Sequence, residues 1–169
     1  MGELLARKKI GLVFGGGRIG LMGVVADAVL AGGGEAIGVI PKALKERELG
    51  HDGVTELRIV PSMHARKAMM AELADGFIAM PGGFGTLDEL CEILTWAQLG
   101  IHKKPCGLLN VNNFFAPLLV LFEHQMEEGF LAAKHRALLL VEEKPEALVK
   151  ALMEASRPGA PGPLHGTSR

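Results

Sequence analysis

The chain has 169 residues, a formal net charge of −1 and a hydrophobic content of 49%. This length suits one domain with a single sizeable core, and the near-neutral charge gives no electrostatic footprint for nucleic acid or an anionic membrane. No uninterrupted apolar stretch approaches the length of a membrane span and the N-terminus lacks a secretory signal pattern, so we expect a soluble, cytoplasmic protein.

Short apolar runs alternate with amphipathic segments along the chain, which is typical of a parallel sheet with helices on both faces. Right-handed crossovers then give an α/β fold with a Rossmann-like, doubly wound sheet. The pattern predicts strands at residues 10–14, 36–40, 57–60, 77–80, 107–109 and 138–141, and helices at residues 20–31, 62–74, 86–99, 114–128 and 145–154.

The remaining segments set the domain organisation. We expect one Rossmann-like nucleotide-binding domain over residues 1–155, opening with residues 1–9 as the end of a helix. Residues 42–53 are charged and irregular, and are predicted to form a surface loop. Residues 156–169 are rich in proline and glycine, and are predicted to be a flexible tail.

A glycine loop follows the first predicted strand. Residues 15–20 (GGGRIG) match G-x-G-x-x-G between a strand and a helix, the pattern of dinucleotide sites. Such sites carry an acid at the end of the second strand, where this chain has Ile40 and Pro41, and Glu35 lies at the opposite end of that strand. The missing acid disfavours NAD binding, but the glycine loop remains compatible with a nucleotide that carries a single phosphate.

A helix is predicted to start after the third strand, at the sheet edge where ligands bind in open α/β folds. Ser62 is its candidate N-cap, and Arg66 offers a planar fork to a phosphate, base or sugar. Lys67 points about a quarter of a turn away and is the weaker candidate. The alternative for Arg66 is a surface arginine whose stem packs along the helix.

A second glycine turn, PGGFGTLDE at residues 81–89, joins an apolar strand to a helix and places a carboxylate in its first turn. Glycines let the backbone approach a ligand, and the N–H groups of a helix start attract an anion. Thr86 is the candidate cap and phosphate donor, and Glu89 is placed to meet an attached sugar. The alternative is an ordinary turn whose acid complements the helix dipole.

Other reactive side chains give little sign of a site. Cys91 and Cys106 form no C-x-x-C pair and are predicted to be free buried thiols. His64 and His102 have no ligand partner at metal-binding spacing, so we predict no metal.

Four segments together resemble one family. Residues 81–89 resemble the PGGxGTxxE motif of the LOG ("lonely guy") family of cytokinin riboside 5'-monophosphate phosphoribohydrolases, long labelled as possible lysine decarboxylases. Residues 15–23, 63–67 and 95–109 resemble its first glycine loop, its arginine-bearing helix start and the stretch after the motif helix. The resemblance runs from about residue 4 to residue 149.

The resemblance implies hydrolysis of an N6-substituted adenosine 5'-monophosphate to free base and ribose 5-phosphate, without a cofactor, by a protein that is commonly a dimer. An oxocarbenium-like transition state is stabilised by a nearby carboxylate, for which Glu89 is the candidate, and Arg66 can offset charge on the departing purine. Arg66 and Glu89 are thus the expected catalytic residues, and the expected substrate-binding residues are Gly15, Gly16, Gly17, Met63, Lys67, Pro81, Gly82, Gly83, Gly85 and Thr86.

Two alternatives stay open, and a third is disfavoured. A broader purine nucleotide nucleosidase would use the same core residues. A carrier of a nucleotide or of a pterin cofactor (the molybdenum cofactor) would bind phosphate without chemistry. The pairing of Arg66 with Glu89 disfavours a carrier. One departure favours it: family members have a strand and a loop before the helix at residues 1–9, and here either the sequence starts late or the sheet is reduced. A pyridoxal phosphate decarboxylase needs a Schiff-base lysine, and no lysine has such a context.

Overall fold

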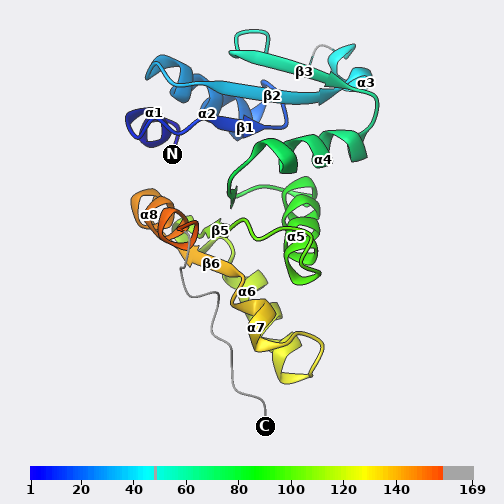
Figure 1. Cartoon of the computed structure of the whole chain (residues 1–169), viewed down its shortest axis with the longest axis vertical. Helices are drawn as coiled ribbons and strands as arrows, with labels where there is room; N and C mark the ends of the chain where they lie inside the picture. The colour runs from blue at the N-terminus through cyan, green and yellow to red at the C-terminus, as the bar shows by residue number, and fades with distance from the viewer. Residues whose placement is uncertain (48, 158–169) are drawn as a thin grey trace. The chain divides into compact units, whose positions relative to one another are not determined.

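The computed structural model describes residues 1–47 and 49–157. The chain divides into two compact units, Met1–Ala74 and Asp75–Arg169, called here the N-terminal and the C-terminal unit. Each has its own parallel sheet (Figure 1). The single domain predicted for residues 1–155 remains a prediction, and from residue 158 onward the predicted tail lies outside the described residues.

The N-terminal unit is built on a three-stranded parallel sheet of order β1-β2-β3 (Figure 1). Leu12 of β1 pairs with Ala36 of β2, and Ile37 of β2 pairs with Glu56 of β3. Its elements are α1 (Gly2–Arg7), β1 (Leu12–Phe14), α2 (Gly20–Ala31), β2 (Ala36–Pro41), α3 (Lys42–Lys45), β3 (Glu56–Val60) and α4 (Met63–Leu73).

The central strand β2 and the helix α2 supply the core of this unit. Val39 and Ile40 on β2 and Ala26 and Val29 on α2 are almost completely buried. Burying a Val or Ile side chain contributes about 1.5–3 kcal/mol. Helix α1 lies so close to α2 that a Cβ atom on Gly2 would be 2.6 Å from the carbonyl oxygen of Val25. The start of the chain is therefore packed into the unit.

The C-terminal unit contains the second parallel sheet, of order β4-β5-β6. Its core cluster is formed by Leu90, Leu108, Phe115 and Leu139. Its elements are β4 (Phe77–Ala79), α5 (Phe84–Gln98), β5 (Cys106–Leu109), the 3-10 turn η1 (Val111–Asn113), α6 (Ala116–Glu127), α7 (Ala133–Arg136), β6 (Leu139–Glu142) and α8 (Pro145–Ala155).

These elements confirm the predicted α/β class and its Rossmann-like alternation, because each of the six predicted strands forms within the described residues. Two predictions were wrong in detail. Residues 42–53 are not all loop, since α3 occupies Lys42–Lys45. Helix α5 begins at Phe84 and not at Thr86, because Gly83 takes the extended N-cap conformation.

No helix within residues 1–47 and 49–157 has both the length and the apolar character that crossing a bilayer would require.

Gly23 in α2 is the glycine whose replacement should cost most stability. A Cβ atom there would lie 2.1 Å from the carbonyl oxygen of Arg18, and a backbone atom cannot move aside cheaply. We expect Gly23→Ala to lower the free energy of unfolding by about 2–4 kcal/mol, measured by urea denaturation. The control is Gly11→Ala, where the nearest atom would be 3.9 Å away. Equal stability of the two variants would contradict this prediction.

Candidate active site

The first glycine loop joins β1 to α2, and either packing or backbone conformation favours glycine at several of its positions. Gly16 has a φ of +71° and Gly20 a φ of +67°, a region that other residues seldom adopt. A Cβ atom on Gly16 would also lie 3.2 Å from Cβ of Ile40. The loop is therefore a tight turn at the carboxyl end of β1, buried at Gly16 and Gly17 and exposed from Arg18 onward.

Arg66 lies directly against this loop. Ser62 caps α4 as predicted, its side chain accepting a hydrogen bond from the Ala65 amide at 3.1 Å. One turn on, Arg66 is only 8% exposed, so it is not a surface arginine. A Cβ atom on Gly15 would be 1.8 Å from its Nη2 atom. Glycine at position 15 thus makes room for the guanidinium, a contact that sequence analysis did not anticipate.

The other two residues predicted at the start of α4 flank Arg66. Met63 is 42% exposed, and its Sδ atom lies 4.0 Å from Nη1 of Arg66. Lys67 follows Arg66 directly and is half-buried. The N-terminal unit therefore brings together Arg66, Met63 and the first glycine loop, including Gly15, Gly16 and Gly17.

Residues 49–51 line this loop, a contact that sequence analysis did not anticipate. Gly17 and Gly50 form an isolated antiparallel bridge. The Arg18 amide donates to the Leu49 carbonyl at 3.0 Å, and the His51 amide donates to the Gly16 carbonyl at 2.9 Å. The segment had been predicted as a surface loop because its charged sequence has no periodicity.

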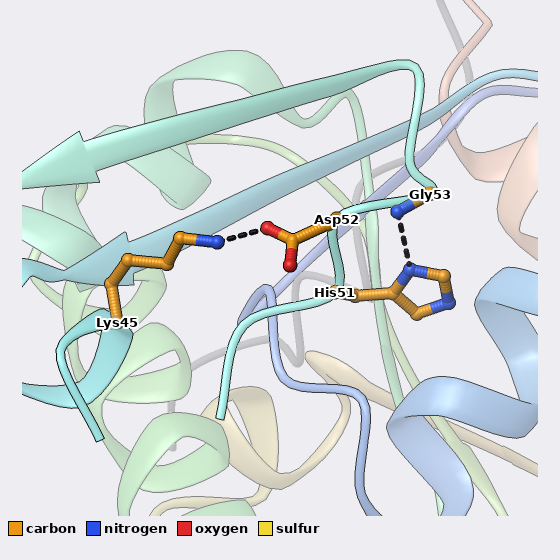
Figure 2. A network of polar contacts seen from close by, with 4 residues as sticks. All are labelled: Lys45, His51, Asp52 and Gly53. Atoms are coloured by element: carbon orange, nitrogen blue, oxygen red, sulfur yellow. Dashed lines mark hydrogen bonds and ion pairs between the residues drawn. The ribbon is translucent and has the colours of Figure 1, made fainter. Parts of the chain in front are cut away.

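Two polar contacts are found in the turn that follows this bridge (Figure 2). Asp52 accepts a hydrogen bond from Lys45, which holds the pKa of the Asp52 carboxyl below its usual range. The Gly53 amide donates to Nδ1 of His51 at 3.2 Å. The backbone of Leu49 and His51 is thus hydrogen-bonded to the loop, and the His51 ring is bound by the turn that follows.

The second glycine loop joins β4 to α5 in the C-terminal unit. A Cβ atom on Gly82 would lie 2.2 Å from Oγ1 of Thr86, so the Thr86 hydroxyl lies directly over Gly82. Gly83 and Gly85 differ, because a Cβ atom on either would meet nothing within 4 Å and neither has a positive φ. Neither a packing contact nor a positive φ therefore requires glycine at these two positions.

The later residues of the motif occupy other positions than predicted. Thr86 is not the N-cap, because Gly83 takes that position and Thr86 lies in the first turn of α5. Glu89 is half-buried and lies in the second turn, since the first turn contains no acid. Pro81 is half-buried at the end of β4. The exposed helix start is thus formed by backbone and the Thr86 hydroxyl, with the carboxylate one turn further along.

The two expected catalytic residues belong to different units, Arg66 to the N-terminal and Glu89 to the C-terminal unit. That they serve one site remains a prediction. Two hollows in the C-terminal unit have volumes of about 380 and 140 Å³, and neither is lined by a predicted site residue. Within the described residues, no three His, Cys, Asp or Glu side chains are grouped to hold a metal ion.

The two cysteines are free thiols, as predicted, but Cys91 is exposed and not buried. Cys91 lies on a helix face that the core does not cover. Partial desolvation of its sulfur, with a smaller contribution from Asp88, raises the pKa of the Cys91 thiol, and full burial raises the pKa of the Cys106 thiol to about 12.

We expect iodoacetamide at pH 8 to label Cys91 slowly and Cys106 not at all, because the thiolate is the reactive form and a raised pKa depletes it. Labelling of Cys91 should accelerate as the pH rises toward its pKa. Mass spectrometry of the labelled peptides measures this, and the urea-unfolded chain, with both cysteines labelled, is the control. Fast labelling of Cys106 in the folded protein would contradict the prediction.

Comparison with known proteins decides the family. The family model described as "Possible lysine decarboxylase" matches residues 22–152. The chain is 51% identical over 156 residues to the cytokinin riboside 5'-monophosphate phosphoribohydrolase LOG4 of Arabidopsis thaliana, covering 92% of this chain and 73% of the relative. The chain belongs to the LOG family.

Other LOG proteins show the same similarity. The phosphoribohydrolase of Rhodococcoides fascians is 49% identical over 153 residues, covering 90% of this chain and 77% of that protein. The LOG enzyme of Oryza sativa subsp. japonica is 52% identical over 154 residues, covering 91% of this chain. The chain spans 64% of the rice protein's length, less than two thirds.

A solved structure shares the fold of this LOG family member. The molybdenum cofactor binding protein from Rippkaea orientalis matches with a TM-score of 0.65 over 90% of this chain and 83% of that protein. At 24% sequence identity this likeness concerns the fold alone.

Proposed function

We propose that this LOG family member hydrolyses the N-glycosidic bond of a nucleoside 5'-monophosphate, with N6-substituted adenosine monophosphate as the preferred substrate. Water adds to C1' of the ribose, the bond from C1' to the base nitrogen breaks, and the base leaves with a proton. The open start of α5 supports this proposal most directly, in a chain about half identical to named phosphoribohydrolases.

Phosphate binding is assigned to this helix start. Gly83 and Gly85 leave the space beside them empty, so a ligand can approach the backbone there. The first amides of a helix have no intrahelical partner and carry the positive end of the helix dipole. Together with the Thr86 hydroxyl they suit the 5'-phosphate of a nucleotide, with Pro81 and Gly82 shaping the turn.

The chemical step is assigned to Glu89, one turn beyond the phosphate site on α5. Breaking the glycosidic bond places positive charge on the ribose, and a fixed carboxylate stabilises it and orients the attacking water. Because the phosphate is held on the same helix, its binding energy positions the sugar against the carboxylate. Nucleosides without the phosphate should therefore be poor substrates.

Arg66 is assigned to the same nucleotide, with Met63, Lys67 and residues 15–17 as further contacts. Its guanidinium is fixed against Gly15, which provides a positive charge at a defined position. Such a group offsets the negative charge that develops on the departing purine.

Partner and location remain predictions. We propose a small-molecule nucleotide as the ligand, a homodimer or larger homo-oligomer as the assembly, and the cytoplasm as the location, with no binding to nucleic acid or membranes.

A measurement of base release tests the proposed function. The protein is incubated with AMP, isopentenyladenosine monophosphate and the matching nucleosides, and free base and ribose 5-phosphate are quantified by chromatography. We expect base release from the monophosphates, fastest from the N6-substituted one. Binding of AMP without release of base would favour the nucleotide carrier and contradict the proposal.

Thr86→Ala should mainly weaken phosphate binding. The hydroxyl is one neutral donor among several backbone amides, so we expect KM for AMP to rise about three- to tenfold with kcat within about twofold. Steady-state base release measures both constants. Thr95→Ala, on the same helix, is the control, because its hydroxyl donates to the Cys91 carbonyl at 2.7 Å. A large fall in kcat with unchanged KM would contradict the assignment.

A further inference from the structure

We propose that His51, together with Asp27, is a positioning residue that holds the first glycine loop ready for the nucleotide; this inference rests on the proposed function. Nothing in the sequence pattern marks either residue. Both belong to the N-terminal unit, so every contact in the argument lies within one unit.

The main chain of the His51 segment fixes the loop from one side. Hydrogen bonds run from His51 to Gly16 and from Arg18 to Leu49, on either side of the Gly17–Gly50 bridge. The loop thus has a carbonyl and an amide bound to residues 49–51. A shift of that segment would move the loop with it.

The side chain of His51 anchors the segment to α2. Its Nε2 atom lies 3.0 Å from Oδ1 of Asp27, and its Nδ1 atom accepts the hydrogen bond from Gly53. Since Nδ1 accepts, the neutral ring carries its hydrogen on Nε2 and donates it to the Asp27 carboxylate. The ring is 12% exposed and meets Phe14 edge-on, with 6.5 Å between ring centroids. One imidazole therefore links α2, the end of β1 and its own turn.

The first glycine loop contacts the proposed site residue Arg66 through Gly15. Gly15 immediately precedes Gly16 and is in contact with the guanidinium of Arg66. A loop held in its bound conformation lowers the entropy cost of ligand binding. Removing the contact between His51 and Asp27 should therefore weaken nucleotide affinity more than it slows the chemical step.

The same segment supplies a matched control. Figure 2 shows the Lys45–Asp52 pair and the His51 ring on opposite sides of the segment. The side chain of Asp52 is 78% exposed and that of Asp27 is 71% exposed. Asp27→Ala and Asp52→Ala each remove one exposed carboxylate, but only the first removes the partner of His51.

The experiment compares Asp27→Ala, His51→Ala, the double variant and Asp52→Ala with the wild type. KM and kcat for AMP are measured by base release, and Kd for AMP by calorimetry in the Glu89→Gln background. We expect KM and Kd to rise about three- to tenfold in both single variants, with no further rise in the double variant and kcat within about twofold. Asp52→Ala should match the wild type.

The outcomes separate this inference from the proposed function. Unchanged KM and Kd in Asp27→Ala, whose exposed site does not threaten folding, would overturn the inference while base release by the wild type sustains the function. Equal losses in Asp52→Ala would overturn it too. If the wild type binds AMP without releasing base and the variants bind it more weakly, the inference stands and the function falls. A wild type that binds no AMP would overturn both.

Discussion

Glu89→Gln is expected to lower kcat for base release by at least about a thousandfold while changing Kd for AMP by less than about threefold. Glutamine keeps the size of the side chain but loses the negative charge that stabilises the oxocarbenium-like ribose. Single-turnover measurements at saturating enzyme isolate the chemical step, and calorimetry with AMP reports binding.

A neighbouring acid provides the control for this prediction. Asp88 precedes Glu89 on α5 and is exposed, so Asp88→Asn removes the same charge from the same turn of the helix. We expect its kcat to stay within about threefold of the wild type. Wild-type turnover by Glu89→Gln, or an equal loss in Asp88→Asn, would show that Glu89 has no specific chemical role.

Gly15→Ala is expected to lower kcat/KM by about a hundredfold or more, because misplacing a catalytic group by about 1 Å has effects of this size. The added methyl carbon would lie 1.8 Å from Nη2 of Arg66, so the guanidinium must leave its position against the loop. Arginine has a flexible end, and the stability loss should therefore be smaller than that of Gly23→Ala. Steady-state kinetics and urea denaturation measure the two effects.

A double variant tests whether this loss acts through Arg66. Once Arg66→Ala has removed the guanidinium, the methyl group at position 15 has nothing left to displace, so Gly15→Ala should cause little further loss. Fully additive losses would mean that Gly15 acts by another route. Wild-type activity in Gly15→Ala would show that the position of Arg66 is unimportant.

The sequence predicted those features that depend on local pattern. The strands were found because short apolar runs lie between glycine-rich turns, and Ser62 caps α4 because its side chain accepts from an amide three residues away. The family, too, was found from contiguous motifs such as residues 81–89, and the matches to named LOG proteins confirm it.

Features that depend on contacts between distant residues were missed. The contact of Arg66 with Gly15 was not anticipated, because it joins residues 51 positions apart and leaves no local pattern. His51 lay in a segment without periodicity, although its partners Asp27 and Gly16 give it a defined position. The start of α5 was misplaced because Gly83 caps the helix through backbone conformation and not through a side chain.

The empty space beside Gly83 and Gly85 has an evolutionary consequence. A Cβ atom on Gly85 would meet nothing within 4 Å, and alanine has the higher helix propensity, so packing and propensity give no reason to retain glycine at position 85. A pressure to keep glycine at position 85 would then come from what the protein binds. Substitutions at the start of α5 would then change ligand specificity while the protein still folds. This helix start is therefore a suitable target for laboratory selection of new specificities.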